Sequence, residues 1–571
     1  MVRGPPLRPP RFTHIGAALS AAGGGDDAGV TFVDLHEREE RRSWRVVEAR
    51  ARLSADALYR AGIRPGDRVA IVVKVGPTFL DAFFGTCLAG AVPVVLAPPR
   101  RTRALDSWSR ATGRMLMRTG ARAVIAEAES ARRIEALLPG QNAAQLHDAA
   151  TLVERGTRAV HSSTPAPEAL ACVQFSSGTH SEPKAVALSH RSIMAQLAML
   201  ESSMEYGPSE RRSMACWLPL NHDMGLFGHL LHAVYCAAPI VMAAPETFLA
   251  RPSVMLRAVS RHRVTFMSSP NFFYALCTRR VADAELEGVD LSSWRFILNG
   301  AEPVAPAIVR AFGERFRPYG LDPERMMPVY GLAEATLAVT FAPPGRPTRS
   351  IAIDGAQLAR TGEISPGTFE VASVGPPVAG VEVEVRDDDG RAVPARRVGH
   401  VWVRSPSVML GYLGDPEATR STLVQGWLNT GDLGFLDDGE LTLCGRAKDV
   451  VIIRGANHVP EEFEACLDDM TNEGVRAGSA VAVGFVPQGA GEELLILAES
   501  RVDPPPSGLE AAIRTRVLER TGILPFGVVL FTRGALPKTT SGKRRRGEAL
   551  RQLLAGEIIP TRSTVRIGPI H

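Results

Sequence analysis

Short runs of β-branched and other apolar residues alternate with stretches of helical periodicity along the first two-thirds of the chain. The segment 68–75 reads R-V-A-I-V-V-K-V and predicts a buried strand between helical stretches at 43–62 and 78–90. Parallel strands need a crossover connection, which is usually a helix, so this alternation favours α/β architecture with largely parallel sheets. The strand pattern recurs at 92–96, 123–126, 240–242 and 296–299.

The pattern changes after residue 370. Segments 381–386, 400–404 and 439–444 are short strands separated by D-D-D-G and D-D-G turns, which predicts a β-rich subregion. From residue 447 the chain has its own alternation of strands and helices, over a length that suits a small separate domain. We therefore expect three parts: a flexible leader over 1–30, a large N-terminal domain over 31–446 and a C-terminal domain over 447–571.

Charge and cysteine usage exclude several classes of protein. The 65 Lys and Arg residues against 61 Asp and Glu give a net charge of +4, which is too small for a dedicated nucleic-acid binder. The seven cysteines are dispersed without a C-x-x-C pair, so we expect reduced thiols in a cytoplasmic protein, with neither a zinc site nor a disulfide framework. No apolar stretch reaches the roughly 18 residues of a membrane-spanning helix, so we expect no integral membrane association.

Lysine is scarce among the cationic residues, which are almost all arginine. A lysine ammonium is compact and mobile, whereas a guanidinium is planar and forked, so retained lysines are candidate functional positions. The five lysines are Lys74, Lys184, Lys448, Lys538 and Lys543.

The segment 174–190 contains a loop rich in hydroxyl side chains. It reads Q-F-S-S-G-T-H-S-E-P-K-A-V-A-L-S-H, follows a strand at 171–175 and precedes a helix that begins near His190. Hydroxyls, free backbone N–H groups and one lysine are the groups that bind a polyphosphate. The Walker pattern G-x-x-x-x-G-K-[ST] is absent, and a plain Ser/Thr turn is the structural alternative.

This loop resembles the phosphate-binding loop of the adenylate-forming superfamily, which includes acyl-CoA synthetases, luciferases, peptide-synthetase adenylation domains and fatty acyl-AMP ligases. Six further motifs follow in the family's order and cover nearly the whole chain. The resemblance implies the superfamily's α/β fold: an N-terminal domain of two α/β subdomains and a β-rich subdomain, with a small mobile C-terminal α+β domain. The motifs are W-L-P-L-N-H-D-M-G-L at 217–226, N-G-A-E-P-V at 299–304, V-Y-G-L-A-E-A-T-L at 329–337, G-W-L-N-T-G-D-L-G at 426–434, G-R-A-K-D-V-V-I-I-R-G at 445–455 and L-P-K-T-T-S-G-K at 536–543.

The resemblance also implies a reaction in which a carboxylate and ATP, with Mg²⁺, give an acyl-adenylate and pyrophosphate. The catalytic residues would be Lys543, Glu334 and Lys184. Glu334 would bind the metal, and Lys543 would reach the acyl carboxylate and the α-phosphate from the C-terminal domain. Lys448 would be the hinge about which that domain turns. The residues implied for ATP and AMP are Ser176, Ser177, Gly178, Thr179, Asn299, Gly300, Ala301, Glu302, Tyr330, Gly331, Asp432 and Arg446.

Several candidates also have a purely structural interpretation. Glu334 can be a charge at a helix start, Asp432 can be a turn residue, and the basic sequence around Lys543 can be a solvated patch. Four positions depart from the family's pattern: His180 stands where Thr is usual, and Ala185 stands where Gly usually follows the lysine. Ser181 replaces Gly, a change common among fatty acyl-AMP ligases, and Asn221 stands where an aromatic residue is frequent. We expect these departures to change nucleotide handling more than the reaction class.

Within the superfamily, the chain is more similar to fatty acyl-AMP ligases than to acyl-CoA synthetases. The segments 454–464 and 341–374 resemble those ligases, in which an insertion at the second place is thought to restrain the domain motion needed for CoA use. The resemblance therefore implies a fatty acid substrate and transfer to the phosphopantetheine thiol of an acyl carrier protein in trans. An acyl-CoA synthetase, an aryl- or amino-acid-activating enzyme and a catalytically dead adenylate-binding protein are alternatives. The implied acyl-pocket residues are His222, Asp223, Met224, Pro270, Asn271 and Phe272.

The basic run K-R-R-R at 543–546 lies next to the presumed active face. Carrier proteins are usually acidic, so this run predicts a docking face that steers the carrier electrostatically. A solvated helix start is the structural alternative.

Replacing Lys543 by alanine is expected to lower adenylate formation roughly 10²–10³-fold, because an electrostatic contact to the reacting oxygens is removed. The fold and ATP affinity should be retained. Pyrophosphate exchange measures the loss, and Lys543→Arg shows whether a compact ammonium is needed. Lys74, which falls in no motif, provides the control Lys74→Ala, and near-normal exchange in Lys543→Ala would contradict the assignment.

Overall fold

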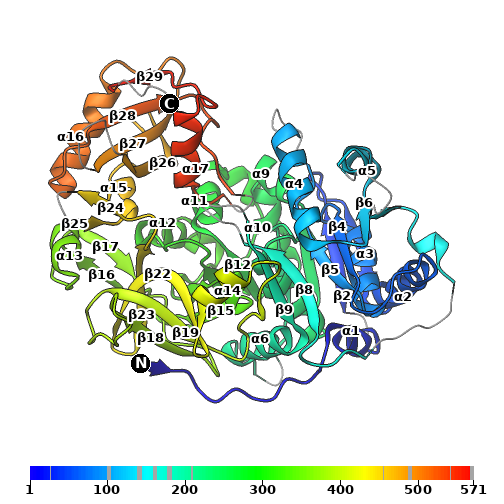
Figure 1. Ribbon diagram of the computed structural model, residues 1–571. Helices are drawn as coiled ribbons and strands as arrows, with labels where there is room; N and C mark the ends of the chain where they lie inside the picture. Colours follow the sequence, from blue (N-terminus) through cyan, green and yellow to red (C-terminus); the bar gives the residue numbers. More distant parts are fainter. Residues whose placement is uncertain are drawn as a thin grey trace.

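Two largely parallel sheets form the body of the protein (Figure 1). The computed structural model describes residues 1–25, 28–99, 105–137, 144–157, 164–176, 183–207, 210–453, 456–485, 492–539 and 542–565. Within these residues, a seven-stranded sheet has the order β20(Gly411–Tyr412), β9(Ala185–Ser189), β8(Leu170–Phe175), β5(Val92–Val95), β4(Arg68–Val72), β6(Ala123–Ala126) and β7(Gln145–Asp148). An eight-stranded sheet has the order β15(Ala338–Phe341), β14(Met326–Gly331), β13(Phe296–Asn299), β12(Phe266–Ser269), β10(Met214–Cys216), β11(Ile240–Ala243), β2(Gly29–Val33) and β3(Glu39–Ser43).

Both faces of these sheets are covered by helices, as the continuous apolar strands require. In β4, Val69 and Ile71 point into the main hydrophobic core, while Ala70 and Val72 point into a second core with α4 and α5. The helices of the body are α1(Ile15–Gly23), α2(Trp44–Arg60), α3(Pro77–Leu88), α4(Leu105–Thr119), α5(Ala128–Glu135), α6(His190–Ser203), α7(Asp223–Gly225), α8(His232–Tyr235), α9(Pro245–Ala250), α10(Ser253–Arg261), α11(Asn271–Arg280), α12(Pro306–Phe316) and α14(Pro416–Thr422). The predicted α/β alternation is confirmed.

A third sheet is entirely antiparallel and contains the segments expected to be β-rich. Its strands pair in the order β1, β18, β19, β22 and β21, with β23 on β22. These strands are β1(Val2–Arg3), β18(Glu382–Arg386), β19(Gly399–Arg404), β21(Leu423–Val424), β22(Trp427–Asp437) and β23(Glu440–Arg446).

The N-terminal segment differs from the flexible leader that we expected over 1–30. Its first strand pairs with β18, with Val2 opposite Val383. Helix α1 buries Ile15 and Leu19 in the main core, and the Arg11 guanidinium donates to the Tyr235 carbonyl at 2.6 Å. The Pro- and Arg-rich composition concealed these contacts, because the apolar residues that anchor the segment are few and widely spaced.

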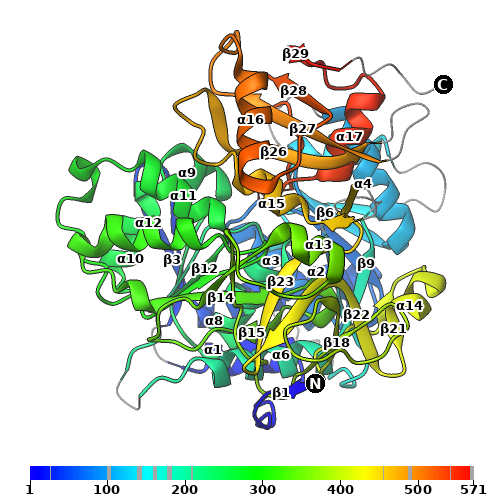
Figure 2. The ribbon, with the colours of Figure 1, turned by 90° about the vertical axis from the view of Figure 1, so that its left-hand side faces the viewer.

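The C-terminal part has its own sheet, β26(Val475–Phe485), β27(Glu493–Ser500), β28(Gly527–Phe531) and β29(Arg562–Ser563). Alternate residues of its strands enter two cores: Ile496 packs toward α15 and α16, and Leu497 packs toward α17. Both cores consist of residues from 451 onward. Figure 2 shows α15 at the base of this C-terminal unit, next to the body. Its other elements are β24(Val451–Ile453), β25(Ala456–His458), α15(Pro460–Ala465), α16(Leu509–Thr521) and α17(Arg546–Leu554).

The Pro/Gly-interrupted stretch 341–374 folds as a small module, β16(Ser350–Ile353), α13(Gly355–Thr361) and β17(Phe369–Ala372). Its Leu358 shares a buried cluster with Phe435 of the body and with Val459 of the C-terminal unit. Helix α13 accordingly lies beside β25 (Figure 1). The module therefore joins the body and the C-terminal unit through one apolar core.

None of the helices in the described part of the chain combines the length and the apolar character needed to cross a bilayer.

A buried ionic cluster organises the C-terminal unit around Arg546. The Arg546 guanidinium donates to Asp449 at 2.8 Å, to Glu461 at 2.9 Å and through two bonds of 2.8 Å to Glu464. Arg544 donates to the same Glu464 at 2.9 Å. The expected docking face at 543–546 is therefore not supported, because Arg544 and Arg546 are neutralised within the unit.

Replacing Arg546 by alanine should lower the free energy of unfolding by about 3–5 kcal/mol, since buried carboxylates lose their cation. The free energy of unfolding of Arg546→Lys should lie between those of Arg546→Ala and the wild type. Lysine keeps the positive charge but lacks the forked guanidinium. Urea unfolding followed by circular dichroism measures the change. The neighbouring Arg545→Ala is the control, and an equal loss in both alanine variants would contradict the role of the cluster.

Candidate functional site

The candidate site lies where strands of both large sheets of the body end. Ser176 follows β8, Asn271 follows β12, Ala301 follows β13 and Glu334 follows β14. In open α/β sheets, the carboxyl ends of the strands are where ligands bind. These residues line one cavity of about 1770 Å³ between the body and the C-terminal unit.

The C-terminal unit contributes Lys543 to this cavity. The turn that carries it is closed by two hydrogen bonds, from the Lys543 amide to Thr539 Oγ1 at 3.0 Å and from the Thr539 amide to the Lys543 carbonyl at 2.9 Å. Gly542 has φ +92°, and a methyl group there would lie 3.5 Å from the Phe272 ring of α11. The turn therefore rests directly on the body.

Burial lowers the pKa of Lys543, and the charge of Asp223, with smaller contributions from Glu302 and Asp432, opposes this fall. The pKa of Glu302 is raised by burial against the pull of Arg544 and Lys543. Cationic and anionic groups thus face the same enclosed space, and each lessens the cost of burying the others.

Asp432 is held by two partners in the wall of the cavity. Its Oδ2 accepts a hydrogen bond from the Tyr330 hydroxyl at 2.5 Å, and its Oδ1 pairs with Arg446 Nε at 3.0 Å. The Asp432 charge raises the pKa of Arg446, and burial together with Asp432 raises the pKa of Tyr330. Strand β22 carries Asp432 directly opposite Arg446 of β23, so the sheet register sets this contact.

Glu334 lies at the cavity wall, where its Oε1 accepts from the Tyr412 hydroxyl at 2.8 Å. The Lys184 ammonium lies 4.4 Å from the centre of the Tyr412 ring, a cation–π distance. No Lys or Arg in the described residues forms an ion pair with Glu334, so its charge is available to a cation. A single carboxylate suits Mg²⁺ when phosphate oxygens supply further ligands, and the described residues contain no cluster of three or more potential metal ligands.

Asn271 fixes the chain that follows β13. Its side chain accepts from Asn299 Nδ2 at 2.9 Å and donates to the Pro303 carbonyl at 2.7 Å. Between these points, Ala301 has φ +73°, which a non-glycine residue rarely adopts. Asn271 and Asn299 thus hold the turn that presents Ala301 and Glu302 to the cavity.

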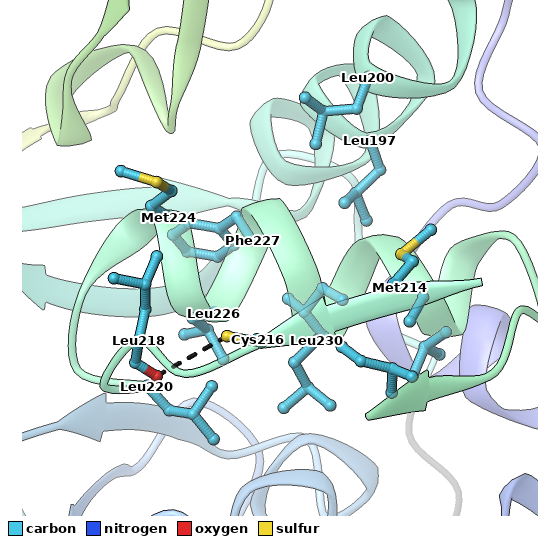
Figure 3. Close-up of a cluster of buried hydrophobic side chains, with 14 of the residues drawn as sticks. Leu197, Leu200, Met214, Cys216, Leu218, Leu220, Met224, Leu226, Phe227 and Leu230 are labelled. Atoms are coloured by element: carbon cyan, nitrogen blue, oxygen red, sulfur yellow. Dashed lines mark hydrogen bonds between the residues drawn. The ribbon is translucent and has the colours of Figure 1, made fainter. Parts of the chain in front are cut away.

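A polar pair and an apolar wall meet at the start of α7. His222 Nδ1 lies 2.7 Å from Asp223 Oδ1, which also accepts from the Met224 amide at 2.7 Å. The charges of His222 and Lys543 outweigh burial and lower the pKa of Asp223. Next to Met224, Gly228 and Leu337 add apolar lining, here called the apolar extension. Figure 3 shows Met224 beside Phe227, on the side of the helix opposite Leu226 and Leu230. The cavity therefore combines charged groups at one end with an apolar extension, an arrangement that suits a polyanion with a hydrophobic chain.

The structure brings most of the sequence-predicted residues together, with exceptions. Lys184, Pro270, Asn299, Gly300 and Lys448 do not line the cavity, although Lys184 approaches it through Tyr412. Ser177, Gly178 and Thr179, together with His180, lie outside the described residues. Those that line the cavity are Ser176, His222, Asp223, Met224, Asn271, Phe272, Ala301, Glu302, Tyr330, Gly331, Glu334, Asp432, Arg446 and Lys543.

Sequence reasoning missed Tyr412 and left Lys538 open. Tyr412 connects Lys184 to Glu334, yet it lies in the short strand β20, away from every motif. Lys538 lines the cavity and donates to the Gly478 carbonyl at 2.8 Å, and burial lowers its pKa to about 8. The signals for Lys538 were the scarcity of lysine and its place in the motif at 536–543, and neither assigned it a role.

The comparisons with known proteins agree on one family. Residues 20–413 match the family model described as AMP-binding enzyme. The chain is 32% identical to a putative acyl-CoA synthetase of Caulobacter vibrioides, over 95% of this chain and 96% of that protein. It is 30% identical to the medium-chain-fatty-acid–[acyl-carrier-protein] ligase JamA of Moorena producens, over 94% of each. A structure from a study of fatty acyl-adenylate ligases of E. coli and L. pneumophila matches with a TM-score of 0.88 at 31% identity, over 97% of this chain and 99% of that chain.

Gly542→Ala is expected to lower ATP–pyrophosphate exchange roughly 10²-fold, because relief of the strain at its positive φ shifts the backbone next to Lys543. A side chain at φ +92° is strained, at a cost of about 1–2 kcal/mol. Gly534→Ala is the matched control, since Gly534 has φ +84° in the same unit with open space around it. Both variants should lose similar stability, and equal exchange rates in the two would contradict the role of Gly542.

Proposed function

The chain belongs to the family of AMP-binding enzymes, and we propose that it activates a fatty acid as an acyl-adenylate and passes the acyl group to the thiol of a carrier protein. The single observation that carries the proposal is the continuity of one cavity from Lys543, Glu334 and Asp432 to an apolar extension beyond Met224. ATP would occupy the charged end of this cavity, and the fatty acid would occupy the apolar extension.

The nucleotide end is assigned to the groups around Asp432. Each carboxylate oxygen of Asp432 has one protein partner and further acceptor capacity, so it can also accept from ribose hydroxyls. Arg446 pairs with the carboxylate and holds it in place. Tyr330 is fixed by its bond to Asp432, which leaves its ring in the wall, where an adenine can stack.

In the proposed first step, a carboxylate oxygen of the fatty acid attacks the α-phosphorus of ATP, and pyrophosphate leaves with the electron pair of the broken P–O bond. The Lys543 ammonium stabilises the negative charge on the phosphoryl and carboxylate oxygens. Ser176 and Lys184 lie at the two ends of the loop proposed to hold the outer phosphates, where the Ser176 amide donates to the Lys184 carbonyl at 2.9 Å. Mg²⁺ bound at Glu334 would supply charge neutralisation for the phosphate oxygens.

In the proposed second step, the thiol of the carrier's phosphopantetheine arm attacks the acyl carbonyl, its proton passes to solvent, and AMP leaves. JamA, by its name, is a fatty-acid–[acyl-carrier-protein] ligase. The Caulobacter vibrioides relative has a CoA-ligase name, so CoA is the competing acceptor. The apolar core shared by Leu358, Phe435 and Val459 favours the carrier, because it resists the motion of the C-terminal unit that CoA use is expected to require.

The experiment is ATP–pyrophosphate exchange with acids from butyrate to palmitate, and with an aromatic acid and an amino acid as alternatives. Exchange should rise with aliphatic chain length, since each buried methylene contributes about 0.8 kcal/mol. CoA or holo-carrier is then offered to the loaded enzyme, and thioester should form on the carrier. If thioester formed on CoA alone, CoA would be the acceptor and the activation of a fatty acid would still stand. If no fatty acid gave exchange, the proposed function would be overturned.

A further inference from the structure

One wall of the apolar extension is the helical segment that follows Asp223. It consists of α7, a π-helical turn η2(Leu226–Leu231) and α8. Met224 and Gly228 both line the cavity, and their spacing of four places them on the same face about one turn apart. The charges of Asp223 and Lys543 act on each other, so the Met224 end adjoins the reacting groups. Gly228 therefore lies one turn further along the apolar extension.

The missing side chain of Gly228 lets Leu337 approach this helix closely at a position that borders the cavity. Outside its own helix backbone, a methyl group at Gly228 would meet only Leu337 Cδ2 at 3.0 Å and Met224 Cγ at 3.7 Å. Both neighbours line the same cavity. Gly225 differs, because a methyl group there would lie 2.4 Å from the Pro219 carbonyl oxygen. Close backbone packing therefore requires the first glycine, whereas the second adjoins ligand space.

The backbone does not require a glycine at position 228. Its φ is not positive, and glycine within a helix costs about 1 kcal/mol relative to alanine. Irregular π-helical turns of this kind are frequent at functional sites. A glycine that is unfavourable for the helix and borders the cavity is explained by the space that it leaves.

The two sides of this space are held rigidly. His229 Nδ1 donates to the Met224 carbonyl at 2.8 Å, and its Nε2 accepts from the Ser268 amide at 3.1 Å. Opposite, the Leu337 carbonyl accepts from the Leu332 amide at 2.8 Å. Thr336, just before Leu337, has φ +67°. Neither wall can retreat easily from a larger side chain.

We propose that Gly228 sets the width of the acyl pocket one turn beyond Met224, between Met224 and Leu337, and thereby selects for long aliphatic acids. This inference rests on the proposed function, since it assigns the apolar extension to the acyl chain. A short acid ends before Gly228 and does not encounter the substitution. A long chain passes the gap and collides with any added side chain.

The test compares Gly228→Ala and Gly228→Leu with the wild type across butyrate, octanoate, laurate and palmitate. In Gly228→Leu, kcat/KM for laurate and palmitate should fall roughly 10²-fold, while butyrate stays close to the wild-type value. Gly228→Ala should lower palmitate use roughly tenfold, because its methyl group lies 3.0 Å from Leu337 Cδ2 and displaces that side chain. Thermal unfolding should show only a small change in Tm, since the gain in helix propensity offsets part of this cost. Trimming the opposite wall in Gly228→Leu with Leu337→Ala should restore long-chain use.

Gly113→Ala is the matched control. Gly113 lies inside α4, away from the cavity, and a methyl group there would have only ordinary contacts with Leu137 at 3.8 Å. Its chain-length profile should match the wild type. An unchanged profile in both Gly228 variants would overturn the inference, and so would an equal loss for all four acids. In either case, wild-type exchange with fatty acids would leave the proposed function standing.

Discussion

The candidate site exists only while two parts of the chain with separate hydrophobic cores remain in contact. Tyr330 and Asp432 belong to the body, whereas Lys543 belongs to the C-terminal unit. Gly542, which precedes Lys543, lies beside Phe272 of the body. Neither core alone fixes the position of Lys543 relative to Tyr330 and Asp432. The arrangement of the reacting groups is therefore a property of the interface, which includes the buried cluster of Leu358, Phe435 and Val459.

The charged groups in the cavity stabilise one another against burial. Asp432 is shared between Arg446 and Tyr330, and Asp223 lessens the fall in the pKa of Lys543. An anionic triphosphate brought into the same space would raise the pKa of Lys543 further toward that of an ordinary lysine. Ligand binding and the charged state of the lysine would thus reinforce each other.

Local patterns predicted much of the fold and the site, and failed where function depends on distant residues. The short β-branched runs and the ordered motifs identified the strands and most of the predicted residues that line the cavity, because both are encoded within a few positions. The ordered N-terminal segment, the burial of Arg546 and the bridge through Tyr412 each depend on partners far along the chain. The role of Gly228 could not be predicted for a related reason. Its missing side chain matters only because Met224 and Leu337 lie around it.

The pairing of β1 with β18 also affects the order in which the protein assembles. Val2 lies opposite Val383, so the first strand is synthesised long before its neighbour exists. Closing so long a loop is slow compared with forming the local helices and hairpins. We therefore expect this short strand to dock late, after the part of the body that contains β18 has formed. Protection of the Val2 and Arg3 backbone amides from hydrogen exchange would then report that the antiparallel sheet is complete.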